Sequence, residues 1–259
     1  MRVGRLMVAT ALVLALLGMP PAAAAPGEFF EFWEVGYDGP AGGDDRASSI
    51  EIGSDGSVYV SGGVAGELQI GSDVGAVKYS PDGAFMWERR LDLPMRGRSL
   101  MKLDRDDNVY VAGTVIENVE PSGIRLSLTK FDSAGNRLWD ATSHVLTDFT
   151  TLADLEIDDF GNIYIAGYEN RSTIIKYAPD GTQLWIDYPF AELHDLEVDA
   201  TGNLHVTGNL WRTYYDTSFW TAKYDAGGTI IWEAKYDLSL IHISEPTRQR
   251  LESRLRSEG

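Results

Sequence analysis

The chain has 259 residues, of which 44% are hydrophobic and 24% charged, and it contains 27 glycines and no cysteine. This balance is typical of a folded globular protein and excludes a disordered chain, a collagen and a disulfide scaffold. The absence of cysteine also excludes thiol catalysis, Cys-ligated zinc, iron–sulfur centres and a lipoprotein anchor. The formal net charge of -17 disfavours a nucleic-acid partner, because phosphate binding requires basic patches.

Residues 1–24 have the pattern of a signal peptide. Arg2 and Arg5 form a basic start, and the apolar run from Leu6 to Gly18 is shorter than the roughly 20 residues that a membrane span needs. Ala22-Ala23-Ala24 supplies small residues for cleavage after Ala24. An uncleaved anchor helix is the alternative. We therefore expect a bacterial protein that is secreted, periplasmic or on the cell surface, with no membrane span after signal cleavage.

The segment 25–237 is dominated by a repeat that occurs four times, in units at about 48–87, 99–139, 152–185 and 193–232. The first half of a unit reads hydrophobic-Asp-x-x-Gly-Asn-hydrophobic-Tyr-hydrophobic-x-Gly. The second half reads Lys-Tyr/Phe-x-x-x-Gly-x-x-x-Trp. The third unit shows both halves most fully, from Ile157 to Gly167 and from Lys176 to Trp185.

Each half unit consists of two β-rich runs around a turn that contains Asp or Gly, which is typical of a β-hairpin. Two hairpins make a four-stranded antiparallel unit. Val109-Tyr110-Val111 and Ile163-Tyr164-Ile165 are apolar on both faces, so both faces of these strands must be covered by neighbouring units. Four-stranded units with a period of about 40–50 residues are blades of a β-propeller. We predict an all-β propeller with almost no helix after residue 24.

The two ends of the repeat region raise the question of ring closure. Trp33 to Asp38 resembles Trp232 to Asp237, which predicts a strand at 29–38 that ends a unit. Leu238 to Arg248 resembles the translation of a transposase-type sequencing adapter, so 238–259 is interpreted as a non-native tail; a native amphipathic tail is the alternative. We expect a truncated, partial propeller. The alternative is a natural four-bladed closure in which the Trp33 strand completes the last blade.

Both half-unit patterns together resemble the bacterial SBBP-type β-propeller repeat and are similar to the repeats of quinoprotein-like (PQQ-type) propellers. The resemblance spans about Trp33 to Asp237. It implies an exported or surface-attached part of a larger protein, a ring of seven blades when closed, and no catalytic set of residues.

Three features of the sequence could in principle serve as reactive or metal-binding sites. Asp104 to Asn108 has oxygen ligands at alternate positions, as calcium prefers, but it lacks the remaining pattern of a calcium loop and is interpreted as a solvated turn. The pair His194-Asp195 could act as a general base, but no Gly-x-Ser-x-Gly nucleophile turn accompanies it. The lysine at the start of each second half recurs in every unit, which indicates an architectural role. We predict no catalytic, cofactor or metal-binding residues.

The best candidate for ligand binding is the loop from Asn209 to Asp216. Trp211, Tyr214 and Tyr215 offer flat apolar surfaces with polar edges, which suit sugar rings or a peptide. We therefore expect a non-enzymatic exported scaffold that binds protein or polysaccharide. The alternative is a quinoprotein-like dehydrogenase propeller, which would need a docked quinone, a calcium ion and a catalytic Asp.

Overall fold

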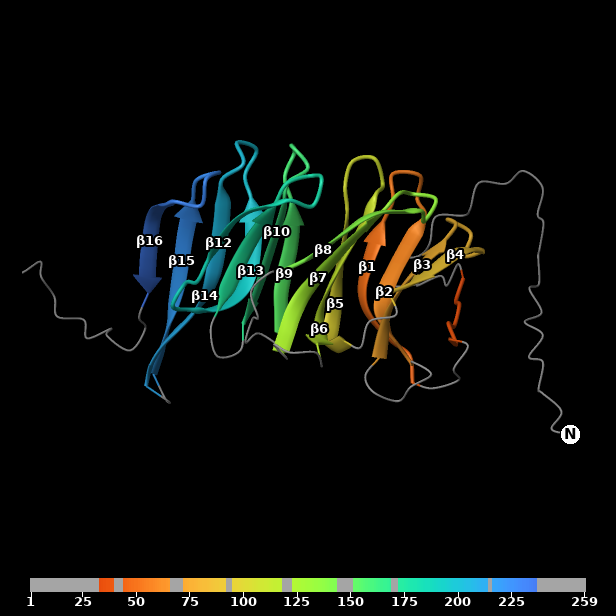
Figure 1. Cartoon of the computed structure of the whole chain (residues 1–259), viewed down its shortest axis with the longest axis horizontal. Helices are drawn as coiled ribbons and strands as arrows, with labels where there is room; N and C mark the ends of the chain where they lie inside the picture. The colour runs from red at the N-terminus through yellow and green to blue at the C-terminus, as the bar shows by residue number, and fades with distance from the viewer. Residues whose placement is uncertain are drawn as a thin grey trace, which may run out of the picture. The chain divides into compact units, whose positions relative to one another are not determined.

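The computed structural model describes residues 33–39, 44–65, 72–91, 95–117, 123–143, 151–168, 172–213 and 216–236. These segments contain sixteen β-strands and no helix (Figure 1). The described residues therefore contain no helix that is long and apolar enough to cross a membrane. The predicted signal peptide at 1–24 and the predicted tail at 238–259 lie outside the described residues.

The strands form four blades of four consecutive strands each. Blade 1 consists of β1 (Arg46–Ile52), β2 (Val58–Ala65), β3 (Ser72–Tyr79) and β4 (Phe85–Arg90). Blade 2 consists of β5 (Met95–Leu103), β6 (Val109–Glu117), β7 (Gly123–Phe131) and β8 (Arg137–Thr142). Blade 3 consists of β9 (Thr151–Ile157), β10 (Ile163–Tyr168), β11 (Thr173–Tyr177) and β12 (Gln183–Asp187). Blade 4 consists of β13 (Glu192–Val198), β14 (Leu204–Thr213), β15 (Asp216–Tyr224) and β16 (Ile230–Tyr236).

Within each blade the strands pair antiparallel with their neighbours in chain order. The first strands of successive blades, β1, β5, β9 and β13, lie beside one another. This is the arrangement of β-propeller blades, so the predicted fold is confirmed. Among the described strands, β1, β5, β9 and β13 contact one another in succession, but β13 has no comparable contact with β1, so the four described blades do not close a ring. Blade 4 has its own outer strand, β16, so it does not need the Trp33 segment to complete it.

Residues 33–39 have no regular secondary structure, and residues 29–32 of the predicted N-terminal strand lie outside the described part. A β-strand requires a neighbour that pairs with its backbone, and none of the described strands pairs with residues 33–39.

The core is divided into three layers, one between each pair of successive blades. In the layer between blades 2 and 3, Tyr110 and Leu128 pack against Ile163 and Tyr177, and all four side chains are fully buried. Each buried side chain of this size contributes about 1.5–3 kcal/mol relative to exposure. The strands of the middle blades are thus covered on both faces, as their sequences predict.

The glycine that ends each first half-unit stands opposite a β-bulge. In blade 4 the pairing register shifts between Leu193 and Asp195, and a Cβ atom on Gly208 would lie 2.2 Å from the Glu192 carbonyl oxygen. In blade 1 a Cβ atom on Gly62 would lie 2.0 Å from a backbone carbonyl oxygen. The recurring glycine is therefore required by the close approach of the first strand to the second.

Candidate functional site

Each blade carries the same row of three side chains across its second, third and fourth strands. In blade 3, Tyr164, Lys176 and Trp185 pair in register on β10, β11 and β12. Lys176 Nζ lies 4.7 Å from the centroid of the Tyr164 ring, and Trp185 meets that ring edge-on at 6.1 Å. Burial lowers the pKa of Lys176. The corresponding rows are Tyr59, Lys78 and Trp87; Tyr110, Lys130 and Trp139; and His205, Lys223 and Trp232.

The tryptophan of each row attaches its blade to the next one. The Trp87 indole N–H donates to the Ser133 carbonyl at 3.2 Å, in the outer turn of blade 2. Trp139 and Trp185 donate in the same way to carbonyls in the outer turns of blades 3 and 4, those of Pro179 and Ala226. These contacts place the recurring tryptophan between neighbouring blades, as the sequence predicts.

A glycine in the same outer turn packs directly against the tryptophan ring. Gly181 has a φ of 85°, and a Cβ atom there would come within 2.9 Å of the Trp139 ring. A Cβ atom on Gly228 would come within 2.8 Å of the Trp185 ring. In each case the carbonyl that accepts the indole N–H belongs to the residue two positions before the glycine. The interface between blades thus follows one rule: a carbonyl for the indole nitrogen and a bare glycine for the ring.

The recurring aspartate of the first half-unit holds its own turn. Asp158 Oδ1 accepts hydrogen bonds from the backbone N–H groups of Phe160 and Asn162, and Asp158 Oδ2 accepts from the Asn162 side chain at 2.7 Å. The Tyr164 hydroxyl donates to the same oxygen at 3.2 Å. The Asp-x-x-Gly-Asn pattern is therefore an architectural element that ties the turn to the tyrosine of the row.

Asp104, the first residue of the calcium-like segment, has the same role. Its carboxylate accepts hydrogen bonds from Asn108 and from the Tyr110 hydroxyl, and Lys130 Nζ lies 3.4 Å from Oδ2. Burial of the Asp104 carboxyl raises its pKa, but the hydrogen bonds from Asn108 and Asp106 and the charge of Lys130 together outweigh burial, and the net pKa is lowered. The interpretation of this segment as a solvated turn that holds no calcium stays a prediction.

Blade 1 departs from the repeat because Gly53 stands where the other blades have the aspartate. The buried Tyr59 hydroxyl consequently has no hydrogen-bond partner. The blade 1 turn is instead bound from the neighbouring blade: Asp107, a non-glycine residue at φ 57°, accepts from Ser54 N at 2.9 Å and from Ser54 Oγ at 2.7 Å. The sequence marks Asp107 as unusual, because it replaces the glycine of the other units. The sequence does not indicate that Asp107 contacts Ser54 of blade 1.

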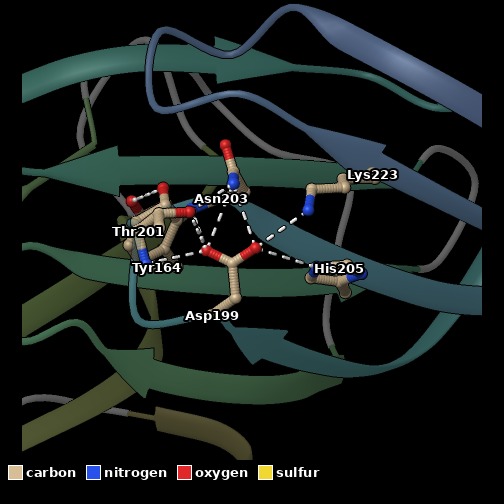
Figure 2. A network of polar contacts seen from close by, with 7 residues as sticks. Tyr164, Asp199, Thr201, Asn203, His205 and Lys223 are labelled. Atoms are coloured by element: carbon tan, nitrogen blue, oxygen red, sulfur yellow. Dashed lines mark hydrogen bonds and ion pairs between the residues drawn. The ribbon is translucent and has the colours of Figure 1, made fainter.

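Blade 4 exposes the cluster shown in Figure 2, whose centre is the Asp199 carboxylate. Thr201 Oγ1 donates to Oδ1 at 2.6 Å, and Lys223 Nζ lies 2.9 Å from Oδ2. The Asn203 side chain also donates to this carboxylate, and His205 Nε2 lies 3.3 Å from Oδ2. Hydrogen bonds from Thr201, Asn203 and Lys223 lower the pKa of Asp199. This carboxylate is a fixed anion within a turn, and it is unsuited to proton transfer near neutral pH.

The predicted aromatic loop is largely a pair of strands. Trp211 lies in β14 and pairs with Thr217 of β15, and the pairing continues to Thr213 and Asp216. Tyr214 and Tyr215 lie outside the described residues. The segment is therefore the end of a long hairpin, because antiparallel pairing continues where an irregular loop was expected.

A pair of acidic residues lies on the first strands of blades 3 and 4. Asp154 on β9 accepts hydrogen bonds from Leu155 N at 2.8 Å and from Leu196 N of blade 4 at 3.1 Å. Burial and the neighbouring carboxyl group of Asp195 raise the pKa of Asp154 to about 6. His194, the residue considered as a general base, is exposed and contacts the side chain of Asn209 at 2.8 Å.

The comparisons with known proteins show likeness of fold without a family assignment. No protein-family profile and no curated protein matches the chain. A solved protein of unknown function from Dyadobacter fermentans is similar over 78% of this chain and 66% of its own length, with a TM-score of 0.51 and 12% identity. A protein of unknown function from Bacteroides caccae matches 74% of this chain and 82% of its own, with a TM-score of 0.45 and 11% identity. The β-propeller domain of the Trilobed protease from Pyrococcus furiosus matches 74% of this chain and 56% of its own, with a TM-score of 0.45 and 10% identity.

Proposed function

We propose that the chain is a non-enzymatic, exported β-propeller module of a larger secreted or surface protein, of the SBBP type, and that it binds a protein or polysaccharide. The use of the repeated polar residues supports this proposal. The aspartates hold turns, the lysines lie over tyrosine rings, and the tryptophans join blades. These residues have architectural roles, and ligand binding is therefore assigned to aromatic residues that the other units do not share.

The observation that carries the proposal is the aromatic extension of the β14–β15 hairpin. The pairing of the second and third strands ends at Gly167 and Thr173 in blade 3 and continues three and four residues past the equivalent glycine in blades 1 and 2. In blade 4 it continues five residues beyond Gly208, to Thr213, and of these extensions only this one carries a tryptophan. At about 3.3 Å per residue this extension is roughly 16 Å long. Trp211 lies on the extension, and Tyr214 and Tyr215 are in the segment that connects its strands.

Affinity electrophoresis in gels that contain soluble polysaccharides tests this assignment. The chain is expected to be retarded by at least one polysaccharide, and replacement of Trp211, Tyr214 and Tyr215 by alanine is expected to abolish the retardation. Phe190→Ala is the matched control, because Phe190 is an exposed aromatic residue outside this hairpin. Retention of binding by the triple variant would assign the ligand to another surface. A pull-down of secreted proteins with the same variants tests a protein ligand.

The dehydrogenase alternative makes a separate prediction. A quinoprotein-like site would bind pyrroloquinoline quinone together with calcium, and binding to the folded state would raise the melting temperature. The proposed module is expected to show no shift with either addition.

A further inference from the structure

The face of blade 4 that is turned away from blade 3 has the residue positions that, in blades 1, 2 and 3, contact the following blade. We define this free face by His205, Phe219, Lys223, Trp232 and Tyr236, which alternate along β14, β15 and β16 with the residues that pack on blade 3. Trp232 is 43% exposed, Phe219 57% and Tyr236 58%. Three large aromatic side chains on one sheet face are a feature that usually marks an interaction surface.

The equivalent positions in the other blades are covered by the blade that follows. Val74 and Leu126, which occupy the position of Phe219 in blades 1 and 2, are 1% and 0% exposed. Trp87, the equivalent of Trp232 in blade 1, is 8% exposed and donates its indole N–H to the next blade. The contacts that cover this kind of face can therefore be identified from the interfaces between blades 1 to 4.

These contacts specify the occupant of the free face. In all three completed interfaces, the tryptophan meets a β-hairpin turn with a glycine at positive φ. The carbonyl two residues before that glycine accepts the indole hydrogen bond, from Ser133, Pro179 and Ala226 in turn. A partner for Trp232 needs the same carbonyl and the same bare glycine.

A second copy of the chain offers such a turn at Gly83, but the adjoining surface of blade 1 is already occupied. Tyr37 Oη lies 2.5 Å from Glu88 Oε1, and Arg90 Nη2 lies 3.1 Å from Tyr37 Oη. Glu88 and Arg90 alternate with Trp87 on β4, so Tyr37 lies on the face of blade 1 that is turned away from blade 2. The outer strand of a docked second copy would need the same place.

We propose that the free face of blade 4 is a docking surface for one further four-stranded repeat of the same class, supplied by the larger protein. Its outer turn accepts the Trp232 indole N–H and places a glycine on the Trp232 ring. This inference rests on the part of the proposed function that makes the chain a module of a larger protein, and it is independent of any ligand of the β14–β15 hairpin.

The test adds the missing repeat. In the fusion protein, a second copy of residues 190–236 follows Tyr236 directly and replaces 237–259, which keeps the spacing between successive tryptophans. The copied turn at Gly228, which covers Trp185 in the natural chain, is then available to cover Trp232. Hydroxyl-radical oxidation of Trp232, read by mass spectrometry, is expected to fall in the fusion towards the rate of Trp87. Trp232→Ala is expected to lower the melting temperature of the fusion more than that of the original chain.

Two further variants keep the test decisive. Gly228→Ala in the copied unit alone is expected to restore oxidation of Trp232, because a Cβ atom would meet the ring. Gly56→Ala in blade 1 is the matched control at a positive-φ glycine away from the free face. Unchanged oxidation of Trp232 in a folded fusion would overturn the proposal. Dimerisation of the original chain with protection of Trp232 would also overturn it, in favour of a second copy. Polysaccharide retardation reports on the proposed ligand separately from either result.

Discussion

Met101 on β5 and Ile50 on β1 occupy the same position in successive repeats, yet Met101 is 2% exposed and Ile50 is 64% exposed. Each of the two residues pairs with a valine on the second strand of its own blade, so their own blades do not account for the difference. Met101 is covered by blade 1, whereas Ile50 faces the side on which no described blade lies. In this architecture local sequence determines the blade, and the neighbouring blade determines what is buried.

The other end of the array shows the same contrast. Tyr164 in blade 3 is fully buried under blade 4, whereas His205, at the same position in blade 4, is partly exposed. The middle blades should therefore depend on the residues of the repeat for stability far more than the end blades do. The first two predictions below compare one position of the repeat in the two environments.

The largest expected contrast is between Tyr164→Ala and His205→Ala. Removal of a fully buried aromatic ring costs about 3–5 kcal/mol, because it combines lost apolar burial with a cavity. Removal of a partly exposed side chain usually costs about 1 kcal/mol or less. Urea denaturation of both variants measures the difference, and equal losses would show that His205 is covered in solution.

The second contrast is between two tryptophans of the row. Trp87→Ala removes a nearly buried ring and its hydrogen bond to Ser133, and is expected to cost about 3 kcal/mol. Trp232→Ala removes a ring with no following blade and is expected to cost about 1 kcal/mol. The free energy of unfolding in urea reports both. A cost at Trp232 that matched Trp87 would contradict an open face.

The third contrast concerns two glycines with nearly the same backbone. Gly228 and Gly56 have φ values of 87° and 81°, so alanine at either position costs about 1 kcal/mol from conformation alone. At Gly228 the new Cβ atom would also lie 2.8 Å from the Trp185 ring, whereas at Gly56 its nearest neighbour is at 3.4 Å. Thermal unfolding should therefore show a larger loss for Gly228→Ala. Equal losses would mean that the ring moves aside without cost.

The last expected effect is on pH dependence. The pKa of Asp154 is raised to about 6 in the folded chain, above its ordinary value of about 3.9, so the folded state binds more protons between these values. Stability therefore falls as pH rises from about 4 to about 6. Asp154→Asn should flatten this part of the stability profile, measured by urea denaturation across that range. An unchanged slope would show that the carboxyl group is hydrated or differently paired.

The blade boundaries could be predicted from sequence because they depend on local signals. The unit predicted at 152–185 corresponds to blade 3, which runs from Thr151 to Asp187, because each turn carries its own Asp, Gly or Asn residue. The Trp211 segment was predicted as a loop because its composition does not show that pairing with Thr217 continues through it.

Contacts between blades could not be predicted from the sequence in the same way. The pKa of Asp154 depends on Asp195 and the Leu196 N–H of the next blade, and the contact of Tyr37 with Glu88 joins residues far apart in the chain. No spacing within one repeat encodes such partners.

The most direct test of the open propeller is hydroxyl-radical footprinting of the unmodified chain, with Trp87 and Trp232 read by mass spectrometry in the same sample. The account predicts slow oxidation of Trp87, which is covered by blade 2, and fast oxidation of Trp232 on the free face. Equal protection of the two tryptophans would contradict it, because blade 4 would then be covered by another surface in solution.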